Sequence, residues 1–113
     1  MEKSPKVSII TVVLNRANIL AKCINSIKKQ DYENIEYILV DGGSTDGTVG
    51  LAKSLLGDSD MLVSEPDDGI YNALNKGLRL ATGDIIGFLH SDDAFASDKV
   101  VSEIAAAFSQ NKC

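Results

Sequence analysis

The chain has 113 residues, which is enough for one compact domain with a single hydrophobic core. Hydrophobic residues make up 44% of the sequence and charged residues 24%, a composition typical of folded domains and not of disordered ones. The formal net charge of -5 argues against nucleic-acid binding, which requires clustered Lys and Arg. It also means that a phosphate ligand would need a metal ion or backbone N–H groups to offset its charge.

Several other classes are disfavoured by what the sequence lacks. Cys23 and Cys113 are not spaced as a metal knuckle or a redox pair, and Cys23 lies on the apolar side of a predicted helix. The N-terminal residues contain no apolar signal region, and no apolar run approaches the roughly 20 residues of a membrane span. We therefore expect a single cytoplasmic domain over residues 1–113.

Strand and helix patterns alternate along the chain. The predicted strands are the apolar, β-branched runs 7–13, 35–40, 61–63 and 84–89. The predicted helices cover residues 17–29, 48–56, 70–81 and a last segment whose apolar positions run from Val100 to Phe108, with Ser97 as its N-cap. This alternation predicts a Rossmann-like α/β domain, with a parallel sheet of about four strands and helices on both faces.

Polar and acidic residues follow the predicted strands. Ligands of open parallel sheets bind beyond the carboxyl ends of the strands, near the point where the strand order reverses. Three of the four predicted strands end in acidic segments, which are residues 41–47, 65–69 and 90–93. The first strand ends instead in Leu14, Asn15 and Arg16, and Arg16 lies where it could contact a phosphate or point to solvent. The gathering of these segments predicts a ligand site at this edge.

Asp41 ends the second predicted strand and begins a glycine-rich turn. Its carboxylate could accept hydrogen bonds from a base N–H or from ribose hydroxyls, but Asp is equally common as a turn former or helix cap. The glycines of residues 42–47 permit positive φ and close approach to a ligand. The turn is not a phosphate-binding fingerprint, because it follows the second strand and lacks a Gly-Lys-Ser/Thr sequence.

Asp92 and Asp93 end the fourth predicted strand. Carboxylate oxygens suit Mg²⁺ or Mn²⁺, which also bind substrate phosphates. A solvated pair of carboxylates near the last helix is the alternative that these two residues leave open. His90 is the only histidine, so a zinc site is disfavoured.

Four motifs, in this order, resemble those of family-2 glycosyltransferases of the GT-A fold, and together they cover almost the whole chain. They are Val7-Ser-Ile-Ile-Thr11 with Asn15, Val40-Asp41-Gly-Gly-Ser44-Thr-Asp46-Gly-Thr48, Asn75-Lys-Gly77 with Ala81-Thr-Gly83-Asp84, and Phe88-Leu-His-Ser-Asp92-Asp93. The last motif occupies the place of the family's DXD-type motif, although His90 stands where that motif would have an aspartate. The segment 65–77 is similar to a branch that serves bacterial surface-polysaccharide synthesis.

The resemblance implies a role for each matching position. Asp41 would bind the nucleobase and Asp92 the ribose or a group on the phosphate side, while Asp93 would hold Mn²⁺ or Mg²⁺ at the diphosphate. Further nucleotide-binding positions would be Thr11, Val13, Asn15, Gly43 and Ser44. The sugar pocket would be bordered by Asp68, Gly69 and Tyr71.

The activity that the resemblance implies is transfer of a sugar from a nucleoside diphosphate sugar, with UDP favoured, to a glycan or lipid-linked acceptor, with inversion. The full-length enzyme would work in the cytoplasm or at the inner face of the membrane. In the family, the acceptor site and catalytic base lie in a further C-terminal region. We therefore expect a fragment that binds donor without catalysing transfer, and whose uncovered apolar surface favours self-association.

Two rival interpretations remain. The first is a non-catalytic nucleotide-binding or interaction module. The second is a phospho-acceptor receiver domain, which also has acidic strand ends. A receiver domain would have an acidic pair after its first strand, where this chain has Leu14, Asn15 and Arg16, so that interpretation ranks far behind.

Overall fold

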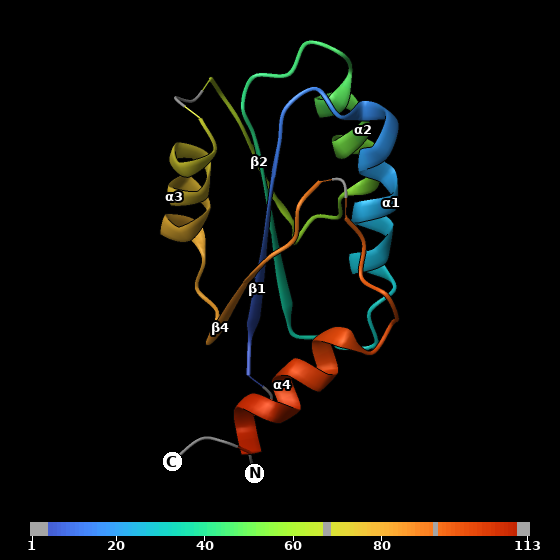
Figure 1. Cartoon of the computed structure of the whole chain (residues 1–113), viewed down its shortest axis with the longest axis vertical. Coiled ribbons are helices and arrows are strands. Elements are labelled where there is room, and N and C mark those ends of the chain that lie inside the picture. Colours follow the sequence, from blue (N-terminus) through green and yellow to red (C-terminus); the bar gives the residue numbers. More distant parts are fainter. Residues whose placement is uncertain (1–4, 67–68, 92, 111–113) are drawn as a thin grey trace.

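The computed structural model describes residues 5–66, 69–91 and 93–110, which fold into an α/β domain (Figure 1). Within these residues, four strands form one parallel sheet in the order β3-β2-β1-β4. The elements are β1 (Val7–Val13), α1 (Ala17–Lys28), β2 (Ile35–Asp41), α2 (Thr48–Leu55), β3 (Met61–Ser64), α3 (Ile70–Leu80), β4 (Ile85–Phe88) and α4 (Val100–Gln110). The predicted parallel sheet with helices on both faces is confirmed, and element ends differ from the prediction by a residue or two.

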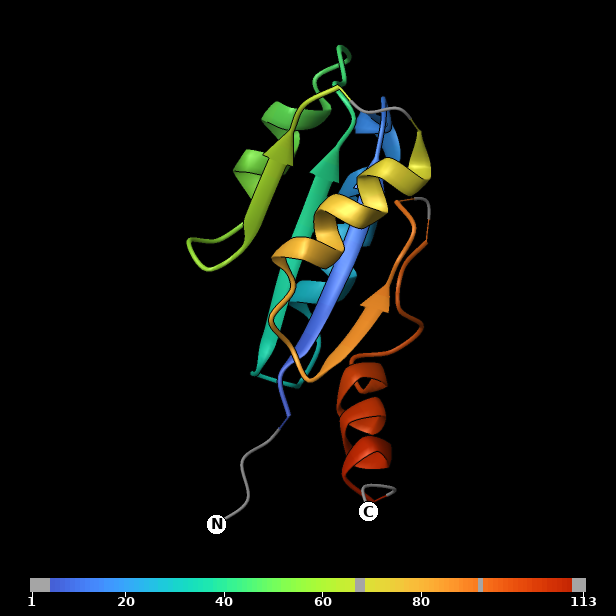
Figure 2. The same ribbon diagram turned by 90° about the vertical axis from the view of Figure 1, so that its left-hand side faces the viewer.

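Helices α1 and α2 pack on one face of the sheet and α3 packs on the other (Figures 1 and 2). Alternation along each strand divides the apolar side chains between two cores. The larger core lies under α1 and α2 and includes the buried helix positions Leu20, Cys23, Ile24 and Ile27, as their spacing predicts. The smaller core lies under α3 and is formed by Ile10, Ile38, Val40 and Ala73.

Helix α3 approaches β1 closely because its contact position is a glycine. A Cβ on Gly77 would lie 2.6 Å from Cγ2 of Ile10, so no larger residue fits without a shift of the helix. The tight contact brings the beginning of α3 to the carboxyl end of the sheet, where Gly69 and Ala73 take part in the candidate site described below.

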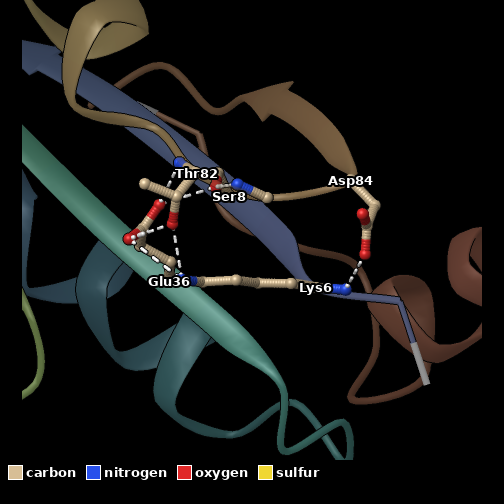
Figure 3. A network of polar contacts seen from close by, with 6 residues as sticks. Lys6, Ser8, Glu36, Thr82 and Asp84 are labelled. Atoms are coloured by element: carbon tan, nitrogen blue, oxygen red, sulfur yellow. Dashed lines mark hydrogen bonds and ion pairs between the residues drawn. The ribbon is translucent and has the colours of Figure 1, made fainter. Parts of the chain in front are cut away.

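A buried carboxylate holds the opposite, amino-terminal end of the sheet together (Figure 3). Glu36 accepts hydrogen bonds from Ser8 Oγ at 2.8 Å, from Thr82 N at 2.8 Å and from Thr82 Oγ1 at 3.0 Å. The Lys6 ammonium lies 3.4 Å from Glu36 Oε2. Gly83 N donates to Ser8 Oγ at 2.9 Å. The network fastens the turn between α3 and β4 to the first two strands.

Helix α4 lies at the amino-terminal end of the strands (Figure 2). Its Val101 and Ala105 are buried against the larger core. Ser97 Oγ accepts a hydrogen bond from Lys99 N, one residue before the helix begins, while Gln30 Oε1 accepts from Val101 N at 3.0 Å. The predicted cap at Ser97 therefore serves the preceding turn, and the side chain of Gln30, in the segment that follows α1, caps the helix itself.

Strand β4 is an edge strand whose side chains on the α3 face are not covered. Ile86 is 41% exposed and Phe88 is 50% exposed, and both lie on the same face as Ile10. An exposed apolar surface was expected from the sequence, and the self-association expected of it stays a prediction. No helix in the described part of the chain is long and apolar enough to cross a membrane.

Candidate functional site

A pocket of about 240 Å³ lies where the strand order reverses, between the carboxyl ends of β1 and β4. The pocket is bordered by the loop after β1, by the beginning of α3 and by Ser91, which lies just after β4. Its lining residues are Val12, Val13, Leu14, Arg16, Gly69, Ala73 and Ser91. Its position is where ligands of open parallel sheets bind, as the sequence predicts.

Asp41 is the last residue of β2 and lies opposite Val13, the last residue of β1. Its carboxylate is buried and hydrogen-bonded. Oδ2 accepts from Gly43 N, Ser44 N and Ser64 Oγ, each at 2.9 Å. Oδ1 accepts from Ser44 Oγ. The residue is 0% exposed. Burial alone raises the pKa of this carboxyl, but the hydrogen bonds from Ser44, Ser64 and Gly43 outweigh it and hold the pKa below its ordinary value.

The two oxygens of Asp41 are therefore unequally occupied. Three donors converge on Oδ2 and one on Oδ1, and a carboxylate oxygen can accept more than one hydrogen bond. Because the group stays ionised at neutral pH, it can act only as an acceptor. The arrangement suits a ligand that presents an N–H or O–H group, and the hydrogen bonds from Ser44 and Ser64 fix the direction in which the carboxylate points.

The loops after β1 and β2 are joined by a pair of exchanged hydrogen bonds. Asn15 N donates to Ser44 Oγ at 2.7 Å, and Asn15 Oδ1 accepts from Thr45 N at 2.8 Å. Asn15 has a φ of +52°, a left-handed conformation that Asn adopts more readily than most residues. Gly43 has a φ of +98° and packs against the backbone of Pro66. The two loops thus form one connected rim beside the pocket.

The beginning of α1 belongs to the same rim. Thr48 Oγ1 accepts a hydrogen bond from Arg16 N at 3.0 Å, and Asp46 Oδ2 accepts from Ala17 N at 3.2 Å. Asp46 Oδ1 in turn accepts from Thr48 N at 3.0 Å and from the Thr48 hydroxyl. The hydrogen bond from the Thr48 hydroxyl is the main cause that lowers the pKa of Asp46.

In the turn after β4, a metal ion would have one described carboxylate. Asp93 is exposed in the turn after β4, where its backbone N–H donates to His90 O at 3.0 Å. The described residues contain no group of three or more His, Cys, Asp or Glu side chains that could hold a metal ion together. One carboxylate fits Mg²⁺ or Mn²⁺, which take the remaining ligands from substrate phosphates and water.

Apart from Asp93, the predicted site residues divide into five groups. Val13 and Gly69 line the pocket, while Asn15, Asp41, Gly43 and Ser44 form the rim beside it. Thr11 is 0% exposed and its Oγ1 lies 3.8 Å from Cys23 Sγ under α1, so its side chain belongs to the core. Tyr71 is 81% exposed and does not line the pocket. Asp68 and Asp92 lie outside the described residues.

Several residues at the site were not predicted from the sequence. The apolar side chains of Val12, Leu14 and Ala73 line the pocket, together with Ser91. Apolar residues carry no chemical signal of their own, although the alternation of strand residues does place Val12 on the opposite face from Thr11. Ser64 reaches Asp41 because the two residues are partners in the register of β2 and β3, which no local pattern reveals.

Known proteins resemble this chain both in sequence and in fold. Residues 8–113 match the glycosyl transferase family 2. An uncharacterised glycosyltransferase of Mycobacterium tuberculosis is 38% identical over 110 residues, a region that covers 96% of this chain and 42% of that protein. This chain thus spans less than half the length of that relative.

Two solved structures share the fold. The mannosyltransferase PcManGT from Pyrobaculum calidifontis, in complex with GDP-Man and Mn²⁺, superposes with a TM-score of 0.80 at 30% identity, over 93% of this chain and 32% of that one. Staphylococcus aureus TarS 1-349, in complex with UDP-GlcNAc, superposes with a TM-score of 0.83 at 25% identity, over 93% of this chain and 31% of that one. The chain has the architecture of GT-A glycosyltransferase domains and belongs to glycosyl transferase family 2.

Proposed function

We propose that this chain forms the donor-binding part of a glycosyltransferase that uses a nucleoside diphosphate sugar. The observation that carries the proposal is the pocket at the switch point of the sheet, beside a buried carboxylate that is held ionised and oriented. The nucleoside would enter between the loop after β1 and the turn after β2. The two similar structures are complexes, one with GDP-Man and the other with UDP-GlcNAc, which supports a nucleotide sugar as the ligand.

Asp41 would select the base. An ionised carboxylate accepts hydrogen bonds and cannot donate them, so it suits a base whose pairing edge presents an N–H group. Uracil, thymine and guanine have such an imino N–H, whereas that position in cytosine and adenine is an acceptor. We favour uracil, as the resemblance implies, and its imino N–H would donate to Oδ1, which accepts one hydrogen bond from within the protein.

The charge of the diphosphate would be offset by two groups. Asp93 would hold Mn²⁺ or Mg²⁺, which neutralises the phosphates and stabilises the leaving diphosphate. Arg16 lines the pocket and has no carboxylate partner among the residues that the structure describes. Its guanidinium matches phosphate oxygens in geometry and charge.

The sugar would be transferred to a glycan or lipid-linked acceptor with inversion of configuration, in the synthesis of a polysaccharide or related glycan. Inverting transfer requires a base that deprotonates the acceptor hydroxyl. No carboxylate or histidine occurs among the described residues that line the pocket. This observation favours a chain that binds donor and, by itself, turns over slowly or not at all.

The experiment is a calorimetric titration of the chain with UDP, GDP, dTDP, CDP and ADP, each with and without Mn²⁺. We expect metal-dependent binding of UDP and weaker or absent binding of CDP and ADP. The variant Asp93→Ala should lose the metal dependence, whereas Asp58→Ala, which removes an exposed carboxylate elsewhere, should not. Binding that ignores both the base and the metal would contradict the proposal.

A further inference from the structure

The first turn of α1 lacks the side chain that ordinarily caps a helix. The N-cap position holds Arg16, which makes no side-chain capping hydrogen bond. Its guanidinium carries only donors and so could not accept one from a helix N–H. Helices usually place Ser, Thr, Asp or Asn at this position, because the first N–H groups of a helix have no partner within it.

Acceptors for this turn come instead from Asp46 in the loop after β2 and from Thr48, the first residue of α2. Thr48 Oγ1 accepts from Arg16 N at 3.0 Å, and Asp46 Oδ2 accepts from Ala17 N at 3.2 Å. The negative charge of Asp46 also suits the positive end of the helix dipole. Because Asp46 accepts a hydrogen bond from the Thr48 hydroxyl, the lone pairs of that hydroxyl remain available for Arg16 N.

Because Asp46 and Thr48 supply these acceptors, the N-cap position need not hold a capping residue and can hold the cation Arg16 at the pocket. Arg16 and Leu14 line the pocket, whereas Asp46 and Thr48 do not. The Thr48 hydroxyl donates to Asp46 Oδ1 and accepts from Arg16 N, so its hydrogen bonds are made within the protein. The pair is therefore connected to the pocket lining through the backbone of residues 14–17.

We propose that Asp46 and Thr48 are positioning residues, which hold the loop of residues 14–17 by capping α1 from the neighbouring loop and so set the affinity for the nucleotide without touching it. The proposal rests on the proposed donor site. Displacement of the first turn of α1 moves Leu14 and Arg16 together, and binding groups lose their effect when they are misplaced by as little as about 1 Å.

The test compares two isosteric substitutions with a conservative one. Thr48→Val keeps the shape and removes the hydroxyl, whereas Thr48→Ser keeps the hydroxyl. Asp46→Asn is an exposed substitution that places an amide donor against Ala17 N or Thr48 N. The control is Ser8→Ala, which removes a buried hydroxyl from the network at the opposite end of the sheet.

Affinity for UDP with Mn²⁺ is measured by calorimetry, and amide hydrogen exchange of Arg16 and Ala17 is measured without nucleotide. We expect Thr48→Val and Asp46→Asn to weaken UDP binding roughly tenfold, which corresponds to a binding-competent first turn of α1 that is populated about a tenth of the time. Both variants should also speed exchange at residues 16 and 17. Thr48→Ser should restore both properties, and Ser8→Ala should leave both unchanged even where it lowers the melting temperature.

Three results would overturn the proposal, and a fourth would bear on the donor site. Unchanged UDP affinity in Thr48→Val and Asp46→Asn would show that the cap does not govern binding. Equal weakening in Ser8→Ala would reduce the effect to general loss of stability. Failure of Thr48→Ser to restore binding would remove the hydroxyl from the explanation. A wild-type chain that binds no nucleotide would instead refute the donor site, and the positioning role with it.

Discussion

The two ends of the sheet each contain a buried carboxylate, and the two differ in what surrounds them. Glu36 at the amino-terminal end and Asp41 at the carboxyl end belong to the same strand, β2. Burial raises the pKa of each carboxyl, and in each the hydrogen bonds outweigh it, so both pKa values lie below the ordinary range. Burial, hydrogen bonding and a shifted pKa are therefore shared by the two ends, and they do not by themselves mark a functional site.

What separates the ends is the neighbourhood of each carboxylate. Glu36 is enclosed by its own cation, Lys6, and by the turn at Thr82 (Figure 3). Asp41 has no cation partner within the described residues, and it lies beside a pocket and a loop in which Asn15 adopts a left-handed conformation. Exposure does not separate the two carboxylates, since Asp41 is 0% exposed and Glu36 is 7% exposed. What separates them is that Asp41 is hydrogen-bonded to Ser44, which joins the loop that lines the pocket, whereas Glu36 joins strands and a turn away from it.

The largest effect should come from Gly83→Ala, which breaks only the amino-terminal network. A Cβ at this position would lie 2.5 Å from Ser8 Oγ and 2.8 Å from Lys6 O. Because one of these atoms belongs to the backbone, relief requires movement of the strand, and we expect a loss of about 3 kcal/mol in the free energy of unfolding. Urea denaturation measures the loss, and UDP affinity below the transition should be unchanged.

Gly50→Ala is the matched control for that substitution. Gly50 lies within α2, and a Cβ there would meet nothing within 4 Å. We expect it to stabilise the protein by about 0.5–1 kcal/mol, since alanine is the better helix former. If Gly83→Ala were as well tolerated as Gly50→Ala, the close packing of the turn against β1 would be refuted.

The two ends of the sheet can be compared directly by replacing each buried carboxylate with its amide. Glu36→Gln and Asp41→Asn each replace an acceptor oxygen by an NH₂ that faces existing donors, and each should lower the free energy of unfolding by about 1–3 kcal/mol. Only Asp41→Asn should also abolish UDP binding measured by calorimetry. Loss of binding in Glu36→Gln at a comparable loss of stability would erase the distinction between the two ends.

Acid should weaken both ends together. The folded-state pKa of Glu36 and of Asp41 is lowered, so their ionisation stabilises the fold at pH values above the unfolded pKa of about 4, and this contribution disappears as the pH falls through the folded pKa. The urea midpoint should therefore fall as the pH drops below about 5, and less steeply in Glu36→Gln. A wild-type midpoint that rises on acidification would contradict the assignment.

Sequence patterns predicted much of the fold and part of the site. The β-branched run Val7–Val13 forms β1 with the predicted bounds, because a strand buried on both faces has a clear local signature. Asp41 stands at the predicted strand end for the same reason. The roles of Ser64, Asp46 and Thr48 were not predicted, because each depends on contacts between segments that are distant in sequence.

Thr11 shows where such reasoning misleads. The family resemblance implied that Thr11 is a nucleotide-binding position, yet the alternation of β1 turns its side chain toward Cys23 in the core. Its neighbour Val12, with no polar group, lines the pocket instead. The direction of a strand side chain depends on its parity relative to the buried faces, and residue chemistry alone does not reveal it.

The smallest effect should come from a substitution between the two ends. Tyr37 is 1% exposed, and its hydroxyl is the buried side-chain group without a hydrogen-bond partner among the described residues. Burial raises the pKa of this hydroxyl. We expect Tyr37→Phe to change the free energy of unfolding by less than about 1 kcal/mol, or to raise it, with UDP affinity unchanged. A loss of several kcal/mol in the same urea assay would reveal a partner for the hydroxyl.

The distinction between the two ends is tested most directly by a titration of the ¹⁵N-labelled chain with UDP and Mg²⁺, which is diamagnetic, followed through its amide resonances. We expect the signals of residues 12–17, 41–48 and 91 to shift, while those of residues 6–8, 36 and 82–84 stay in place. Shifts centred on the Glu36 network, or no shifts at any UDP concentration, would contradict it.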